Sequence, residues 1–317
     1  MRRSLLRLSI LITILLCGAN SFSQTISPLL QAIKNNKLKE VNSLSKKGAN
    51  ISVKDEDGDN VLMYAALYST ADCMELLLKK GADPNAKNNL GETAMLWSIN
   101  DTEKMKVLVR YHADVNAKTI TGNTALIAAC VGFAQKDAVT FLLKNGANPL
   151  LKNERQMTAL MQLALYGDTA TARTLLNSGV NINDTTSLQE TALLFAVRSD
   201  NAKMVHWLLA NGADANIMDS YKAPPLSYAV VLNDVTMVKA LLSKTKDINL
   251  QDIDGMTFLM WATYGEIDNP EIIQALLDAG AQTNLKDAKG NTALAWSQKK
   301  GNTATTALLQ KVTDTNK

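Results

Sequence analysis

The chain has 317 residues, of which 46% are apolar and 20% charged, with 33 Lys and Arg against 30 Asp and Glu. Three of the basic residues, Arg2, Arg3 and Arg7, precede position 24 and no acidic residue does, so the rest of the chain balances 30 against 30. Because nucleic-acid binding needs a surplus of Lys and Arg on one face, this balance gives no electrostatic support for a nucleic-acid partner.

The first residues predict an export signal. A positively charged start is followed by the mostly apolar run Leu8–Cys17 and then by small residues. This run is about half the length that a membrane span of roughly 20 apolar residues requires. We therefore expect a signal peptide at residues 1–23, cleaved after Ser23 or nearby, and a mature chain 24–317 without a membrane span. An uncleaved anchor is the alternative.

A short phrase that begins with glycine recurs along the mature chain, often at intervals of 33 residues, as from Gly146 to Gly179 to Gly212. A fixed period of this size indicates a stacked solenoid of repeats and not one globular core. The period divides the chain into nine units. Their expected bounds are 27–54 for the N-terminal cap, then 55–87, 88–118, 119–152, 153–185, 186–218, 219–251 and 252–286, and 287–317 for the C-terminal cap.

Each unit is expected to begin with a turn and to continue into two helices. Most turns contain a glycine, which tolerates positive φ. In three consecutive units Gln156, Gln189 and Lys222 replace it, so either the turns change shape or they tolerate strain of about 1 kcal/mol each. A glycine suited to end the second helix follows in most units, and one unit has Thr245 there. Threonines suited to cap the first helix follow most turns: Thr93, Thr124, Thr158, Thr191, Thr257 and Thr292.

This pattern resembles the ankyrin repeat family over nearly the whole mature chain. The family unit is a β-turn followed by two helices, with the phrase Thr-Pro-Leu-His-x-Ala, and here the phrase is mostly Thr-Ala-Leu, as in Thr124–Leu126. The resemblance implies an all-α, ankyrin-type solenoid of about eight to nine repeats, whose turns project as fingers beside a concave helical face. The family histidine is replaced, for example by Met63 and Leu194, so other contacts must hold the fingers.

The mature chain contains two cysteines, Cys73 and Cys130. By repeat alignment they lie on helices two repeats apart. Because stacked helices are separated by about 8–10 Å, the two residues should exceed the Cα separation of about 7 Å that a disulfide allows. We therefore expect two buried free thiols.

No catalytic motif is found in the sequence. The two histidines, His112 and His206, lie three repeats apart and so cannot share a metal ion or a catalytic triad. Acidic residues gather in the turn Asp55–Asp59, which we interpret as a solvated or partner-facing finger, with a divalent-cation site as the alternative. We expect no enzyme activity, no cofactor and no metal.

An aromatic residue occupies the same place in the first helix of six units. It would form either a ladder for a ligand or part of the core between repeats. We favour the core, because aromatic side chains bury large areas between packed layers. The series is Tyr64, Trp97, Phe195, Tyr228, Trp261 and Trp296.

A second set of residues is better placed for partner binding. The ends of the first helices, which face the concave groove in the ankyrin family, and the finger tips carry Tyr, Arg, Met and aliphatic residues, which are common interface anchors. The alternative is that several of them are half-buried against the next repeat. The helix-end set is Leu67, Tyr68, Phe133, Leu165, Tyr166, Arg198, Val231, Leu232 and Tyr264. The finger-tip set is Arg155, Met157, Leu188, Tyr221 and Met256.

The three units that lose the turn glycine suggest a region of partner selection. We hypothesise that residues 153–251 form this region, with Tyr166 and Tyr221 contributing more to binding than Tyr68. Neutral drift is the alternative explanation.

The sequence thus favours an exported, monomeric, non-catalytic scaffold that binds another protein. We expect it in the periplasm of a Gram-negative bacterium, with an extracellular location as the alternative. Other functions that fit the same sequence are an inhibitor or immunity protein against a toxin or enzyme, a secreted effector that binds host proteins, and a structural spacer.

Overall fold

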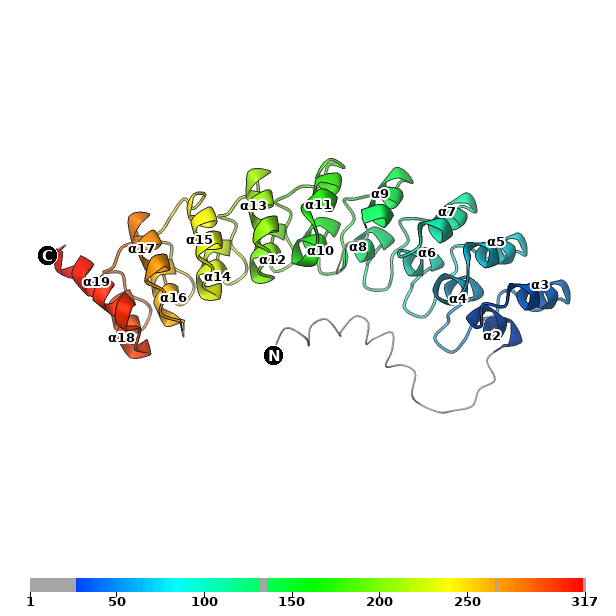
Figure 1. Cartoon of the computed structure of the whole chain (residues 1–317), viewed down its shortest axis with the longest axis horizontal. Helices are drawn as coiled ribbons and strands as arrows, with labels where there is room; N and C mark the ends of the chain where they lie inside the picture. Colours follow the sequence, from blue (N-terminus) through cyan, green and yellow to red (C-terminus); the bar gives the residue numbers. More distant parts are fainter. Residues whose placement is uncertain (1–26, 132–135, 266, 316–317) are drawn as a thin grey trace.

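The structure is a computed structural model that describes residues 27–131, 136–265 and 267–315. These residues form eighteen α-helices and no β-strand. The expected signal peptide and Phe133 lie outside the described residues. The helices follow one another in pairs along an arc, with the first helix of each pair in the inner row and the second in the outer row (Figure 1). The stacked solenoid predicted from the period, and the all-α architecture that the resemblance implies, are confirmed.

The inner row faces the concave side of the arc. It consists of α2 (Pro28–Lys34), α4 (Val61–Tyr68), α6 (Ala94–Trp97), α8 (Ala125–Ala129), α10 (Ala159–Tyr166), α12 (Ala192–Arg198), α14 (Pro225–Leu232), α16 (Phe258–Tyr264) and α18 (Ala293–Lys300). The outer row consists of α3 (Leu38–Lys46), α5 (Ala71–Lys79), α7 (Thr102–Arg110), α9 (Lys136–Lys144), α11 (Thr169–Leu176), α13 (Ala202–Ala210), α15 (Val235–Leu242), α17 (Pro270–Asp278) and α19 (Thr303–Thr315).

Threonine hydroxyls cap most of the inner helices, as the sequence indicated. The hydroxyl of Thr124, for example, accepts the backbone N–H of Ile127 at 3.3 Å. Thr93 is an exception, because it precedes α6 without a side-chain capping bond. Helix α4 uses an amide instead, since Asn60 Oδ1 accepts the backbone N–H of Leu62 at 2.9 Å.

The outer helices end at residues with left-handed backbone. Six glycines take φ between +85° and +93° there: Gly48, Gly81, Gly146, Gly179, Gly212 and Gly280. His112 takes the corresponding place in its unit with φ +62°. Thr245 is not among the described residues with positive φ, so that helix ends without this conformation.

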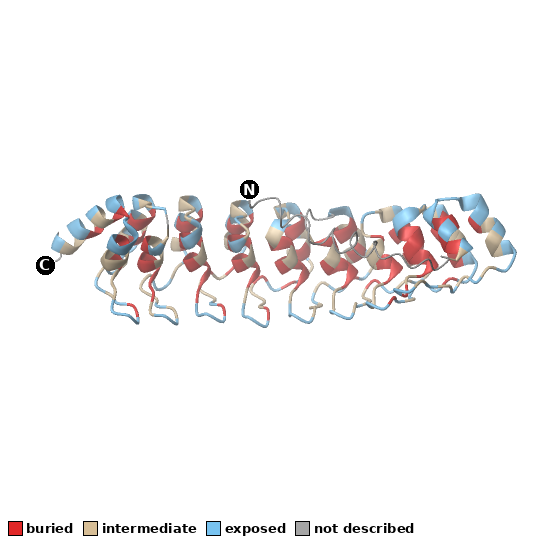
Figure 2. Ribbon diagram, turned by 90° about the horizontal axis from the view of Figure 1, so that it is seen from below, coloured by how far each residue is buried: buried red, intermediate tan, exposed pale blue. Residues whose placement is uncertain are grey.

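The fingers project side by side from one edge of the solenoid (Figure 2). Neighbouring fingers are joined by backbone hydrogen bonds, such as Ile120 N–H to Leu90 O at 2.9 Å and Ser220 N–H to Leu188 O at 3.0 Å. Within the described ranges, no such backbone bond joins the finger of Tyr221 to the next finger.

The turns without glycine keep their shape. Gln156 and Gln189 both have φ +61° and Lys222 has φ +58°, so the left-handed conformation persists and the strain is tolerated. The sequence left open whether these turns change shape or tolerate strain, and the structure supports tolerated strain.

The buried apolar residues form one core cluster that extends through the solenoid. Buried residues recur in the helices along its whole length (Figure 2). Each helix packs against its partner in the unit and against the equivalent helices of the neighbouring units. These contacts between adjacent units are the ones that stabilise a solenoid.

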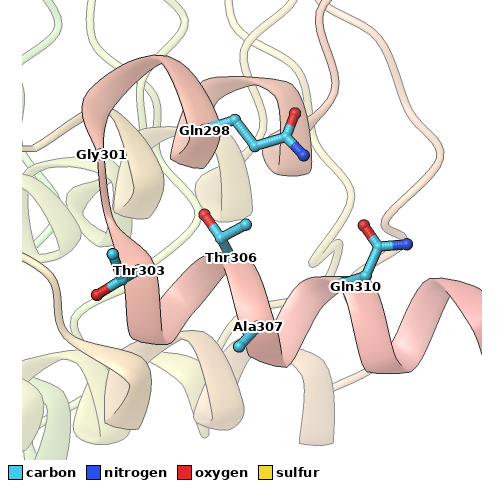
Figure 3. A pocket seen from close by; sticks show the side chains of 6 residues that line it. All are labelled: Gln298, Gly301, Thr303, Thr306, Ala307 and Gln310. Carbon is cyan, nitrogen blue, oxygen red and sulfur yellow. The ribbon is translucent and has the colours of Figure 1, made fainter.

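The C-terminal pair leaves an open cleft of about 460 Å³ between α18 and α19 (Figure 3). The cleft is uncharged and is lined by Gln298, Gly301, Thr303, Thr306, Ala307 and Gln310. It contains no titratable side chain.

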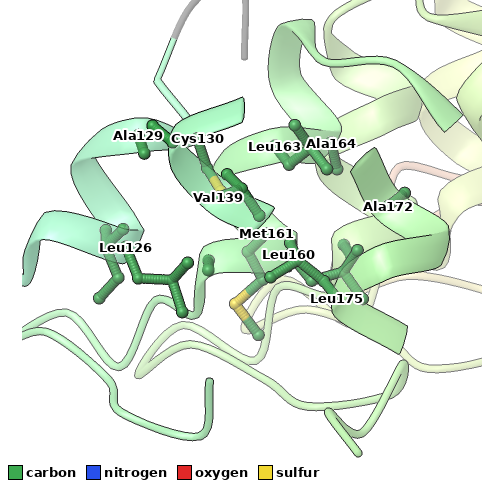
Figure 4. Close-up of a cluster of buried hydrophobic side chains, with 14 of the residues drawn as sticks. Leu126, Ala129, Cys130, Val139, Leu160, Met161, Leu163, Ala164, Ala172 and Leu175 are labelled. Carbon is green, nitrogen blue, oxygen red and sulfur yellow. The ribbon is translucent and has the colours of Figure 1, made fainter. Parts of the chain in front are cut away.

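Both cysteines are buried and free, as predicted. Cys130 lies in the apolar layer between units 119–152 and 153–185, near Val139 and Leu163 (Figure 4). Burial raises the pKa of the Cys130 thiol to about 12 and also raises the pKa of Cys73. Both groups are therefore protonated at neutral pH and have little nucleophilic character.

Candidate partner-binding surface

The first residue of each finger organises the turn that follows it. Asp252 shows the pattern, because its Oδ1 accepts the backbone N–H groups of Asp254 and Met256, both at 2.9 Å. Asn153 makes the corresponding bonds to Arg155 and Met157, both at 3.0 Å. The same two bonds occur in most units, so the fingers share one conformation.

The aromatic series packs against the core, and five of its six members also donate a hydrogen bond to their own finger. Tyr64 O–H donates to Asp55 Oδ2 at 2.8 Å, and Trp261 Nε1–H donates to Asp252 Oδ2 at 2.8 Å. Tyr228 and Trp296 bond the first residues of their units, Asp219 and Asp287, and Trp97 bonds Glu92. These bonds join the finger to the helix in place of the missing histidine.

Three consecutive central units lack this aromatic donor. The equivalent positions, nine residues after the first residue of the unit, hold Ala128, Gln162 and Phe195. Among the described residues, none of these side chains makes a hydrogen bond to its finger. In unit 186–218 the guanidinium of Arg198 in α12 pairs with Glu190 of the finger instead. The fingers of the other two units are held by their turn bonds and by their neighbours.

Asparagine side chains join successive units on the other side of the fingers. Asn183 Nδ2–H donates to Gly212 O at 3.3 Å, while Asn183 Oδ1 accepts Asp214 N–H at 2.9 Å. Each such asparagine thus binds both a carbonyl and an amide of the loop that ends the next second helix. The same pair of bonds is made by Asn85, Asn116, Asn216 and Asn249.

Most of the helix-end set is exposed at or near the ends of the inner helices. The exposed large apolar members are between 41% and 56% exposed: Leu67, Tyr68, Tyr166, Val231, Leu232 and Tyr264. Leu165 is half-buried. Arg198 is exposed but already engaged, since its guanidinium pairs with Glu190 and lies 5.7 Å over the ring of Tyr228.

The finger-tip set divides into two groups. Arg155, Leu188 and Tyr221 are exposed, Tyr221 by 62%. Met157 is half-buried against the core and Met256 is only 7% exposed, so the expected placement of Met256 on the surface is corrected. The reason is positional, because the residue four after the first of each unit bonds back to that first residue and turns its side chain inward.

Three exposed apolar finger residues were missed in the sequence. Leu90, Ile120 and Ile253 are 54%, 59% and 59% exposed and lie in the finger turns, one or two residues before the turn glycine. The sequence signal that could have identified them is an aliphatic residue among the polar residues of a turn. Together with Leu188 and Tyr221, these residues give most fingers an apolar tip.

The acidic turn of unit 55–87 is tied into its surroundings. Asn88 Nδ2–H donates to Asp59 Oδ1 at 2.8 Å. Burial is the main cause that raises the pKa of Asp59 to about 6, and repulsion from Asp55, Asp57 and Glu92 adds to it. Within the part of the chain that the structure describes, no group of three or more His, Cys, Asp and Glu side chains is arranged to hold a metal ion.

At the C-terminal end of the concave face, aromatic rings and lysines gather. The ring of Tyr264 lies edge-on to Trp261 and to Trp296, with centroids 5.6 Å and 5.0 Å away. Lys300 Nζ lies 4.1 Å over the Tyr264 ring and Lys299 Nζ lies 5.0 Å over the Trp296 ring. The cluster therefore presents both apolar surface and positive charge.

The two histidines of the chain lie far apart in the repeat order. His112 and His206 are both exposed and lie on different units. Among the described helices, none combines the length and the apolar character that crossing a bilayer requires.

Comparison with protein families gives one consistent match. A family model described as "Ankyrin repeats (3 copies)" matches residues 7–88, 82–153, 133–219 and 226–317. The matches cover most of the chain and agree with the paired helices and fingers described above. Repeats of this kind indicate a protein–protein interaction scaffold.

Proposed function

The chain belongs to the ankyrin repeat family, and we propose that it is a non-catalytic scaffold that binds one protein partner through its concave helix ends and its finger tips. The observation that carries this proposal is the alignment of exposed apolar side chains at equivalent positions of successive units. Val231 and Tyr264, for example, both lie twelve residues after the first residue of their units and are both exposed.

The energetic argument concerns what these residues gain from a partner. Scattered exposed apolar residues are ordinary on a soluble protein, but an aligned row is typical of an interaction site. Fully burying an exposed Leu or Val side chain contributes about 1.5–3 kcal/mol. A row of several such residues is therefore sufficient for specific binding once the cost of association has been offset.

The hydrogen bonds of the fingers support recognition without large rearrangement. Aromatic donors join each finger to its helix in five units, and asparagine side chains join successive units. A surface that is already held in its binding conformation loses little conformational entropy on association. We therefore propose rigid-body binding by a monomeric scaffold.

The proposed location is the periplasm. Support comes from the charged start, the short apolar run and the small residues within positions 1–23. Fractionation of the cell that makes this protein, with N-terminal sequencing of the recovered chain, tests the location. Recovery of an uncleaved chain from the cytoplasm would contradict it.

The experiment that tests binding is affinity capture from the producing cell with three forms of the protein. The first is the wild type, and the second carries alanine at Tyr68, Tyr166, Tyr221 and Tyr264. The third is a matched control with alanine at four exposed positions of the outer helices: Lys144, Arg173, Lys203 and His206. We expect one stoichiometric partner that is retained by the wild type and the control and lost with the second form. Equal capture by all three forms would contradict the proposal.

A further inference from the structure

Five residues form a strip across the last three units of the concave face. Val231, Tyr264 and Lys299 occupy equivalent positions in units 219–251, 252–286 and 287–317, and Leu232 and Lys300 each follow one of them directly. We call this set the C-terminal strip. All five side chains are exposed. The strip is aliphatic at Val231 and Leu232, aromatic at Tyr264 and positively charged at Lys299 and Lys300.

Carboxylates next to the strip are turned inward and already bonded. Asp252 Oδ2 accepts the indole N–H of Trp261 at 2.8 Å, and Asp287 Oδ2 accepts that of Trp296 at 2.9 Å. Asp268 accepts the backbone N–H of Ala304 at 2.8 Å. These carboxylates therefore accept hydrogen bonds from groups within the fold.

Two lysines of the strip have no carboxylate partner among the described residues. Lys300 lies over the ring of Tyr264, and Lys299 lies over Trp296 and donates to Asn291 Oδ1 at 3.0 Å. A ring and a neutral amide position these ammonium groups without cancelling their charge. By contrast, Lys239 on the outer helix α15 pairs with Glu271 at 2.7 Å.

We infer that the C-terminal strip binds an acidic segment of a partner polypeptide, with an apolar side chain of the segment on Val231 and Leu232 and its carboxylates on Lys299 and Lys300. This inference rests on the proposed function and names the partner chemistry of one part of that surface. Two cations and a neutral mature chain are too little charge for a nucleic acid. The aliphatic end requires an apolar side chain, which an acidic peptide can supply.

The spacing of the units gives the length of this segment. Helices of neighbouring units are about 8–10 Å apart, so two steps from Val231 to Lys299 cover about 16–20 Å. An extended chain rises about 3.3 Å per residue, and it therefore covers this distance in about five to six residues. The expected motif is an aromatic or aliphatic residue followed about five to six residues later by a pair of Asp or Glu.

The test is a selection of random peptides of about twelve residues, displayed on phage, on the purified full chain. Three forms are used: wild type, the double variant Lys299→Glu/Lys300→Glu, and the control Lys144→Glu/Lys203→Glu on the outer helices. We expect the wild type and the control to enrich acidic peptides with the stated spacing. The double variant should bind those peptides about ten-fold more weakly or worse and should enrich Lys and Arg in their place.

Further measurements separate binding from stability. Binding of a selected acidic peptide should weaken several-fold between about 50 and 300 mM NaCl, because exposed charges are screened. Melting of the double variant should remain close to that of the control.

Acidic peptides that bind the double variant as well as the wild type overturn the inference, as does a wild-type selection that enriches no acidic peptide. If peptides are enriched that depend on Tyr166 or Tyr221 but not on the lysines, the proposed function stands and this inference fails.

Discussion

The indole N–H of Trp261 donates to Asp252, nine residues earlier, at 2.8 Å. This bond joins the inner helix α16 to the first residue of its finger. Asp252 also accepts two backbone N–H groups of the finger. The carboxylate of Asp252 thus connects the backbone of the finger turn to the Trp261 side chain of the inner helix. The same geometry recurs at Trp296 and Asp287, at 2.9 Å.

The first prediction concerns this hydrogen bond. Trp261→Phe should destabilise the protein by about 1–2 kcal/mol more than Trp207→Phe does, because a hydrogen bond to a charged group is lost. Trp207 is the matched control, since its Nε1–H is buried without a partner among the described residues while the ring change is the same. Urea unfolding followed by circular dichroism measures the difference. Equal losses in the two variants would show that the bond contributes nothing.

The second prediction concerns the left-handed turns. Gln189→Gly should stabilise the protein by about 0.5–1 kcal/mol, because Gln189 holds φ +61° and glycine removes that strain. Gly255→Ala should destabilise it by more than about 1 kcal/mol, because Gly255 has φ +76° and an added Cβ would lie 2.9 Å from Ala288 N. Melting temperatures of both variants are the measurement. A loss of stability in Gln189→Gly would contradict the strain argument.

The third prediction concerns pH and Asp59. Its pKa is raised from 3.8 to about 6, so the folded protein binds this proton more tightly than the unfolded chain does. The ionised side chain therefore destabilises the fold above about pH 6, and this penalty disappears as the pH falls toward 3.8.

Asp59→Asn should remove that penalty and keep the acceptor for Asn88. We expect it to be more stable than the wild type by about 1 kcal/mol at about pH 7.5, because partial exposure screens the effect, and equally stable at about pH 4. Urea unfolding at the two pH values measures this. A difference that grows on acidification would have the wrong sign and would exclude the explanation.

The fourth prediction concerns coupling between units. Asn183→Ala removes the bond to Gly212 O at 3.3 Å and the bond from Asp214 N–H at 2.9 Å. The loss should cost about 1–2 kcal/mol and should broaden the unfolding transition, because solenoid stability depends on contacts between neighbouring units. Hydrogen exchange should increase at Asp214. As a control, alanine at exposed Asn177, whose side chain makes no hydrogen bond to the described residues, should change neither the stability nor the exchange at Asp214.

The fifth prediction concerns partner selection. If residues 153–251 select the partner, alanine at Tyr166 and Tyr221 should weaken partner binding by more than the same change at Tyr68. All three rings are exposed, by 48%, 62% and 44%, so the comparison is matched in exposure. Binding affinity for the captured partner is the measurement. Equal effects, or a larger effect at Tyr68, would reject this region as the selective one.

The sequence by itself determined the repeat, its helix pairs and the buried thiols Cys73 and Cys130. Each of these depends on local patterns, such as glycine at left-handed positions, threonine before a helix and apolar residues at a fixed period. At these positions the conformation that each residue prefers locally is the one that the stacked repeats require, so the sequence pattern was sufficient to predict it.

Only the tertiary structure decided which side chains face the solvent within a finger. Tyr221 and Met256 are both apolar residues of finger turns, yet Tyr221 is 62% exposed and Met256 only 7%. The hydrogen bond from Met256 N–H to Asp252 turns one side chain inward, and the sequence does not display that bond. The pairing of Trp261 with Asp252 and the position of Lys300 over the Tyr264 ring likewise depend on contacts across turns and units, because composition and period do not specify side-chain direction.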